Sequence, residues 1–122
     1  MQLKECYDTF GGDYESVKER ISKEEIIEKF LIKFLSEPSY ENLCRALEYE
    51  DYKEAFRAAH SIKGVCANLG FPGLENSSSS LTEYLREKEK QQINKEQCME
   101  LFERVSEDYK VVVEAIRKYE ES

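Results

Sequence analysis

Apolar residues recur at steps of three and four positions along most of this 122-residue chain. That spacing lines one face of an α-helix, and no segment pairs alternating apolar residues with a hairpin turn. We therefore predict helices over residues 52–70, 72–88 and 94–119, and a bent helical rod over residues 22–50. Four rods with short connections, each apolar on one face, pack most simply as an all-α, up-down four-helix bundle.

Residues 1–21 are predicted to form two short N-terminal helices that cap the bundle made by residues 22–120. The first helix ends at Gly11, and the second begins with Asp13 as its N-cap. The length of the chain suits one core, so we expect residues 1–122 to form a single domain.

Three of the predicted helices start with the spacing of a capping box, a polar N-cap residue followed three positions later by Glu or Gln. The pairs are Ser22 and Glu25, Asp51 and Glu54, and Asn94 and Gln97. Pro38 must stop or kink the first rod, because proline cannot donate to the carbonyl of Phe34. Gly70 is expected to close the 52–70 helix, and Pro72 suits the first turn of the next helix.

Four consecutive serines at residues 77–80 allow two interpretations, a linker or a helix with small side chains. Leu74, Leu81 and Leu85 keep helical spacing across the serines, which favours the helix. The EKEKQQ segment that follows is predicted to be a polar loop.

The only histidine, His60, is predicted to lie outside the apolar stripe of the 52–70 helix. That stripe consists of Tyr52, Ala55, Phe56, Ala59, Ile62, Cys66 and Leu69. At about 100° per residue, His60 falls roughly 120° from the centre of the stripe. It shares a row with Lys53, Arg57, Gly64 and Ala67, so its imidazole should face solvent.

Gly64 lies one turn after His60, and a glycine inside a helix costs about 1 kcal/mol relative to alanine. Two explanations are open, access of a bulky group to the imidazole or close packing against another helix. Lys63 lies between the stripe and the histidine row, where it either reaches an anion held at His60 or only covers apolar surface. An open imidazole, a nearby cation and a gap suit a histidine that becomes phosphorylated.

One segment resembles the signature of histidine-containing phosphotransfer (Hpt) domains: Ala59-His60-Ser61-Ile62-Lys63-Gly64, followed by Gly70. That signature is alanine, histidine, any residue, an aliphatic residue, lysine and glycine, with another glycine six residues later. The resemblance extends from Phe10 to Leu85, and beyond Leu85 only a helical pattern remains. The serines at 77–80 and the interruption at Pro38 depart from the usual pattern, and neither departure involves the histidine.

The resemblance implies that neutral Nε2 of His60 attacks a phosphoaspartate on a response-regulator receiver domain and passes the phosphoryl group to another aspartate. Lys63 would stabilise the transferring oxygens, and Gly64 would admit the phosphoryl group. The receiver would dock on Phe56, Arg57, Lys53 and Ala67. The resemblance further implies that this chain binds no cofactor or metal, that Mg²⁺ lies on the receiver, and that a hybrid histidine kinase is also a partner.

The net charge of −8 argues against nucleic-acid binding, which needs clustered Lys and Arg. The 52–69 segment nevertheless carries three cations against Glu54 alone, which suits an anionic partner or is an ordinary solvated face. No apolar run is long enough to cross a bilayer and the N-terminus has no secretion pattern, so we expect a cytoplasmic protein, and a monomer. The cysteines lack metal-site spacing and are expected to be reduced thiols: Cys6, Cys44, Cys66 and Cys98.

Other classes of function compete with phosphotransfer. A carboxylate-bridged dimetal bundle needs Glu-x-x-His pairs on facing helices, and one histidine preceded by Arg57 at that spacing cannot supply them. An autokinase is excluded on this chain, because nothing resembles a Gly-rich ATP-binding loop. An interaction-only bundle, with the same fold and docking surface but no transfer activity, stays open.

Overall fold

The computed structural model describes all 122 residues, and the secondary structure in it is entirely helical. Seven α-helices and one 3₁₀ turn follow in this order: α1 (Leu3–Thr9), α2 (Tyr14–Arg20), α3 (Glu24–Phe34), α4 (Ser39–Glu48), α5 (Tyr52–Leu69), α6 (Pro72–Leu85), η1 (Lys90–Gln92) and α7 (Lys95–Glu121). The predicted all-α class is confirmed, since no residue lies in a strand.

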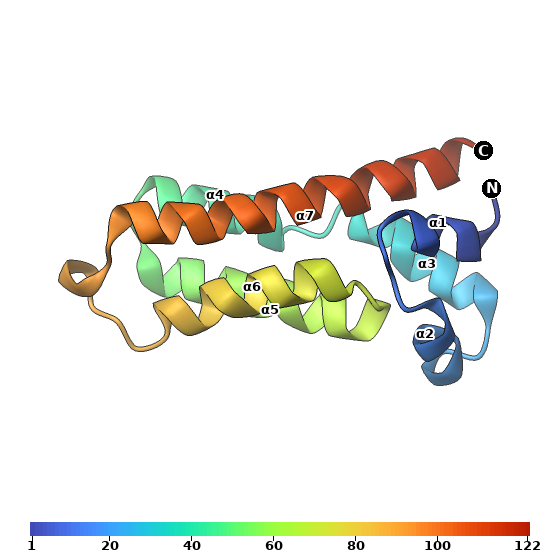
Figure 1. Cartoon of the computed structure of the whole chain (residues 1–122), viewed down its shortest axis with the longest axis horizontal. Helices are drawn as coiled ribbons and strands as arrows, with labels where there is room; N and C mark the ends of the chain where they lie inside the picture. The colour runs from blue at the N-terminus through green and yellow to red at the C-terminus, as the bar shows by residue number, and fades with distance from the viewer.

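The helices form a four-rod bundle along the long axis of the molecule (Figure 1). α5 packs against α4 and α6, α6 packs against α7, and α3 contacts both α5 and α7. α3 and α4 succeed each other and make the first rod, so the bundle has the predicted up-down order. α1 and α2 gather with α3 at one end, where α1 packs on α7 and α2 on α3.

Pro38 interrupts the first rod. α3 ends at Phe34, the chain leaves the helix, and α4 begins at Ser39 with Pro38 as its N-cap residue. Glu37 bridges the gap, because its carboxylate accepts hydrogen bonds from the backbone N–H and the hydroxyl of Ser39, at 3.1 and 2.7 Å. The predicted bent rod is therefore two separate helices in succession.

Three predicted N-caps are confirmed. The carboxylates of Asp13 and Asp51 and the amide oxygen of Asn94 each accept a hydrogen bond from the backbone N–H three residues later, at 3.1, 3.2 and 3.0 Å. At α5 and α7 only this half of the predicted capping box forms, because the side chain of Glu54 pairs with Arg57 and the backbone N–H of Asn94 donates to the Tyr84 hydroxyl.

The capping box predicted at Ser22 and Glu25 is wrong. α3 begins at Glu24 with Lys23 as its N-cap residue, and no side chain caps the helix. Backbone N–H groups of the first turn bond to the Lys23 carbonyl, so the helix starts one residue later than the spacing suggests.

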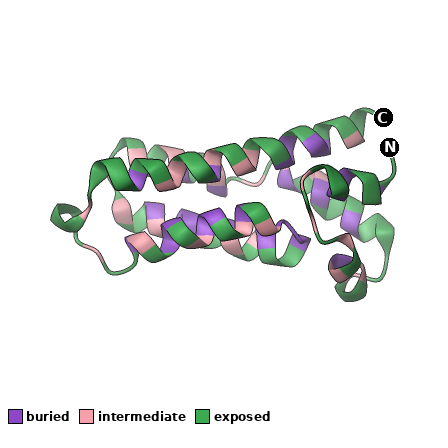
Figure 2. Ribbon diagram, viewed as in Figure 1, coloured by how far each residue is buried: buried purple, intermediate pink, exposed green.

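The core lies where the inner faces of the rods meet (Figure 2). Five residues of the stripe predicted for α5 are buried, and its two aromatic members are half-buried. Ala58 is buried as well, because α4 packs along that side of α5. Four aromatic rings tie the N-terminal helices to the bundle, with centroids 5.1 to 6.1 Å apart: Tyr7, Phe10, Phe34 and Phe71.

Gly70 ends α5 as predicted, with a φ of 74° in the left-handed region that favours glycine. A β-carbon at this position would also overlap Cγ2 of Val17 on α2, so the turn needs a glycine for space as well as for conformation. Pro72 follows as the first residue of α6.

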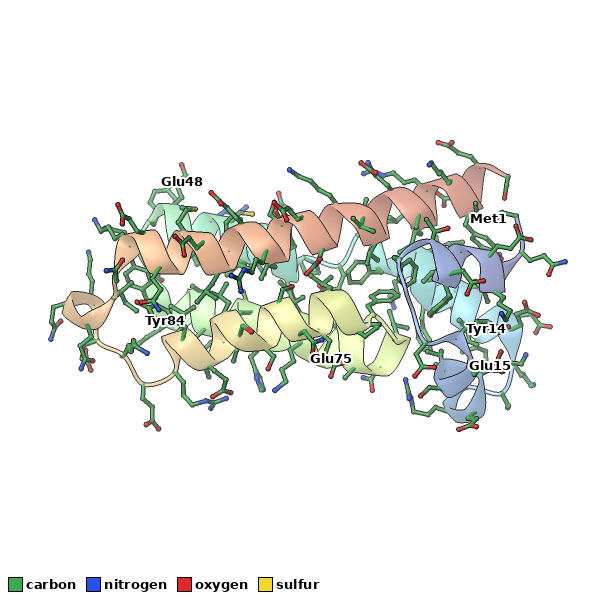
Figure 3. All side chains as sticks on the ribbon, viewed as in Figure 1. Met1, Tyr14, Glu15, Glu48, Glu75 and Tyr84 are labelled. Carbon is green, nitrogen blue, oxygen red and sulfur yellow. The ribbon has the colours of Figure 1, made fainter.

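α6 ends at Leu85, earlier than the predicted end at Lys88, and the polar segment after it contains the η1 turn. Tyr84, labelled near the end of α6 in Figure 3, anchors this connection. Its hydroxyl accepts a hydrogen bond from the backbone N–H of Asn94, the N-cap residue of α7, at 2.8 Å.

The four serines lie inside α6, as the leucine spacing predicts. Ser78 is fully buried, and its hydroxyl donates to the carbonyl of Leu74 at 2.6 Å. Thr82 repeats this arrangement one turn later, donating to the carbonyl of Ser78 at 2.7 Å. Because these hydroxyls are satisfied within their own helix, small side chains face the core without unpaired polar groups.

All four cysteines are free, and three of them are buried: Cys6, Cys66 and Cys98. Burial raises the pKa of the Cys6 thiol to about 11 and also raises the pKa of the thiols of Cys66 and Cys98. The thiols therefore serve as small apolar core residues. No helix has the length and apolar character that a membrane span requires.

Candidate phosphoacceptor site

His60 lies in the middle of α5 with an exposed side chain, as its position on the helix predicts. Its ring nitrogens make no hydrogen bond within the chain. The rest of the predicted row is exposed beside it: Lys53, Arg57, Gly64 and Ala67. The imidazole is thus open to a partner molecule.

Gly64 leaves a gap one turn after His60. A β-carbon built at Gly64 meets no other atom within 4 Å, and the residue is exposed. Close packing against another helix, one of the two explanations left open by the sequence, is therefore excluded. The gap faces solvent on the side of the imidazole.

Lys63 is half-buried on the side of α5 that faces α6, and it makes no ion pair within the chain. The positive charge of Lys63 nevertheless acts on the carboxylate of Glu83 on α6. The pKa of Glu83 is lowered, first by a hydrogen bond from Arg86 and then by the charge of Arg86, with smaller effects from Lys63 and His60. Lys63 and His60 thus share one electrostatic environment with the end of α6.

Phe56 lies one turn before His60 and stacks with it. The ring planes differ by 9° and the centroids are 6.0 Å apart. Arg86 directly follows the last residue of α6, and its guanidinium carbon lies over the Phe56 ring, 5.1 Å from the centroid. Glu83 holds Arg86 through two hydrogen bonds, at 3.2 and 3.0 Å.

Arg86 and Glu83 were not predicted to be near His60. Their spacing of three residues indicates an ion pair at the end of α6, but it does not show which face of α6 meets α5. Only the packing of α6 against α5 brings Arg86 over Phe56.

The C-terminal end of α5 is held by the N-terminal helices. One guanidinium nitrogen of Arg20 donates to the carbonyls of Ala67 and Asn68, both at 3.0 Å. The hydroxyl of the buried Tyr7 donates to the carbonyl of Leu69 at 2.6 Å. Carbonyls that a helix end leaves without intrahelical partners are thereby satisfied.

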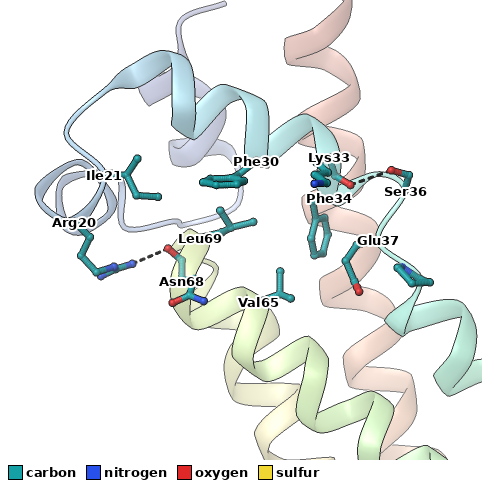
Figure 4. Close-up of a pocket in the computed structure, with 11 residues that line it drawn as sticks. Arg20, Ile21, Phe30, Lys33, Phe34, Ser36, Glu37, Val65, Asn68 and Leu69 are labelled. Carbon is teal, nitrogen blue, oxygen red and sulfur yellow. Dashed lines mark hydrogen bonds between the residues drawn. The ribbon is translucent and has the colours of Figure 1, made fainter.

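Two hollows lie beside α5, and neither is lined by His60. An apolar groove of about 490 Å³ separates α2 and α3 from the end of α5, where Ile21, Phe30 and Val65 face it (Figure 4). A polar hollow of about 500 Å³ lies between α4 and α5 and includes Arg57 and Ser61. No group of three or more His, Cys, Asp or Glu side chains is arranged to hold a metal ion.

The region around His60 matches a known family. The sequence model of the Hpt domain matches residues 34–117, more than half of the chain. The chain belongs to the Hpt domain family. Hpt domains are phosphocarriers of two-component relays that interact with receiver domains, and they are not kinases.

The Hpt match covers α4, α5, α6 and most of α7, and it leaves out the N-terminal part of the chain together with all of α3 except its last residue. It begins at Phe34, the last residue of α3, and continues through α7 to Arg117. The resemblance in the sequence motifs instead extends from Phe10 to Leu85. The family pattern thus includes most of the last helix, and α1, α2 and nearly all of α3 lie outside it. Comparison with curated proteins and with solved structures returned no significant match.

Proposed function

We propose that this Hpt domain carries a phosphoryl group on Nε2 of His60, received from the phosphoaspartate of one receiver domain and passed to another. The observation that carries the proposal is the open space beside the only histidine. His60 is exposed within the matched region, and Gly64 leaves room next to it.

The chemistry needs one nucleophile and a fixed geometry. Nε2 of the neutral imidazole, with the hydrogen on Nδ1, donates its lone pair to phosphorus while the P–O bond to the aspartyl carboxylate breaks. The carboxylate leaves with that electron pair, and His60 holds the group as a phosphoramidate. Transfer to the second receiver reverses these steps. Because the transition state spreads charge over three oxygens, the unpaired ammonium of Lys63 supports it electrostatically.

The docking surface for the receiver is the exposed row around His60 together with its apolar edge. Lys53 and Arg57 present positive charge, and Phe56 and Ala67 present apolar surface on either side of the imidazole. Positive charge suits the acidic site of a phosphorylated receiver. The receiver is expected to bring Mg²⁺ and the carboxylates that hold it, and a hybrid histidine kinase would supply the phosphoryl group through its own receiver.

A transfer assay tests the proposal. The protein is incubated with radiolabelled phosphorylated receiver domains, and the label is tested for stability in acid and in base. We expect an acid-labile, base-stable label on the wild-type protein and none on His60→Gln, which should have the same melting temperature. Label on His60→Gln would overturn the assignment. Receiver binding without any label would identify an interaction-only bundle.

We also infer that the domain acts as a monomer in the cytoplasm. The proposed docking surface is confined to one row of one helix and its edges, so it needs no second copy to be complete. Light scattering on the eluting protein should give the mass of one chain, and a dimeric mass would contradict this inference.

A further inference from the structure

The imidazole of His60 is not oriented by a hydrogen bond. Its ring nitrogens have no partner within the chain. A freely rotating imidazole must align its attacking nitrogen with the breaking P–O bond in every encounter. Catalytic groups are usually held in the reactive orientation by their neighbours. The neighbour that holds this ring must therefore make another kind of contact.

Phe56 provides such a contact. Its ring is nearly parallel to the imidazole, with 9° between the planes and 6.0 Å between the centroids, a separation at which aromatic pairs attract each other. The Phe56 ring is half-buried and packs against the core, so it has less freedom than the exposed imidazole.

Arg86, the C-cap residue of α6, restrains Phe56. Its guanidinium carbon lies over the Phe56 ring at 5.1 Å from the centroid, which is cation–π geometry. Two hydrogen bonds from Arg86 to the Glu83 carboxylate fix the direction of the guanidinium. A row of contacts thus runs from Glu83 through Arg86 and Phe56 to the imidazole.

We propose that Phe56 is a positioning residue for phosphoryl transfer, which sets the ring plane of His60, and that Arg86 holds Phe56 in place. The inference rests on the proposed function of His60. In a histidine side chain, Nδ1 is bonded to Cγ, the ring carbon that joins the ring to Cβ, and Nε2 lies at the far edge of the ring. A ring kept in one plane presents Nε2 in a constant direction, so a larger share of encounters begins near the geometry of attack.

The first test measures the ring itself. His60 is the only histidine, so its Cε1–Hε1 group gives one resolved signal whose order parameter follows from carbon relaxation. Phe56→Leu keeps apolar bulk without the ring, Phe56→Tyr keeps the ring, and Val65→Ala is a control at another half-buried position of α5. We expect an ordered imidazole in the wild type, Phe56→Tyr and Val65→Ala, and a mobile one in Phe56→Leu.

The second test separates positioning from docking. Phosphoramidate, a donor too small to need a docking surface, reacts when Nε2 attacks phosphorus and the donor's P–N bond breaks, releasing ammonia. We expect Phe56→Leu to slow labelling by roughly two- to tenfold, the ratio that corresponds to the usual strength of an aromatic pair. Val65→Ala should label at the wild-type rate, and Phe56→Tyr, which keeps the ring, should label faster than Phe56→Leu.

Each contrary outcome points to one failure. An imidazole that is mobile in the wild type, or equally ordered in Phe56→Leu, overturns the positioning role. If Phe56→Leu takes label from phosphoramidate at the wild-type rate but accepts it more slowly from a receiver, Phe56 acts only in docking. A wild-type protein that takes no label from either donor refutes the proposed function instead, and the relaxation data still decide whether Phe56 orders the ring.

Discussion

Gly64 lies one helical turn after His60, and a β-carbon at Gly64 would touch nothing within 4 Å. An exposed glycine inside a helix with free space around it costs helix stability without a packing reason. We therefore expect Gly64→Ala to stabilise the domain by roughly 0.5–1 kcal/mol. Denaturant unfolding of the two proteins measures this difference.

Gly64→Gln tests the access role at the same position. The longer side chain should leave the melting temperature unchanged or higher, because it extends into solvent, but should obstruct the approach to Nε2 of His60. Thermal melts and receiver-to-protein transfer rates are compared for both variants. A parallel loss of stability and transfer in Gly64→Gln would refute the access role.

Lys63→Ala should slow phosphoryl transfer while changing the free energy of unfolding by less than about 0.5 kcal/mol. The ammonium makes no ion pair whose loss would destabilise the fold, whereas the transition state loses a nearby cation. Lys110→Ala, which removes an exposed cation on α7 outside the proposed docking surface, is the matched control for charge. Equal transfer rates for wild type and Lys63→Ala would show that the lysine only covers apolar surface.

Tyr7→Phe should destabilise the domain by about 1–2 kcal/mol, because the Leu69 carbonyl loses a buried hydrogen-bond donor at 2.6 Å. The transfer rate should stay within the range of the wild type, since Tyr7 lies at the end of α5 and not beside His60. Tyr49→Phe is the control, because Tyr49 is 74% exposed. Equal destabilisation by both substitutions would contradict the role given to the Tyr7 hydroxyl.

Stability should fall in alkaline solution because of the buried thiols. In the folded protein, burial raises the pKa of Cys6 from its ordinary value of 9.0 to about 11, and Cys66 and Cys98 shift in the same direction. Thiols of the unfolded chain ionise first as pH rises, so the unfolded state gains stability over this range. Urea unfolding from about pH 8 to about pH 11 should show the fall.

A cysteine variant isolates this effect. Cys6→Ala removes one of the shifted groups, so the decline in its unfolding free energy over the same pH range should be shallower than in the wild type. The comparison is made on the slopes, since the substitution also changes packing. Identical slopes would mean that the Cys6 thiol does not contribute.

Local patterns in the sequence were sufficient for α5 and its exposed row. The apolar stripe placed His60 on the solvent side, and the cap at Asp51 and the left-handed turn at Gly70 delimited the helix correctly. These signals depend on residues within one or two turns, so they survive whatever the helix packs against.

Contacts between helices could not be predicted in the same way. The position of Arg86 over Phe56 depends on how α6 rotates against α5, which no spacing within either helix specifies. The start of α3 was predicted incorrectly for a related reason. Ser22 has a side chain that can cap a helix, but the path of the chain makes Lys23 the N-cap residue. A capping pattern shows what a residue can do, whereas the path of the chain decides whether it does so.

The hydrogen bonds that Tyr7 and Arg20 donate to the last carbonyls of α5 also affect how much of the chain is needed for an independent folding unit. Both residues precede Phe34, where the family match begins. A fragment trimmed to the family boundaries would retain the histidine and its motif but lose the donors that close the helix carrying them. The segment that defines membership of the family is thus shorter than the segment that this helix needs to be complete.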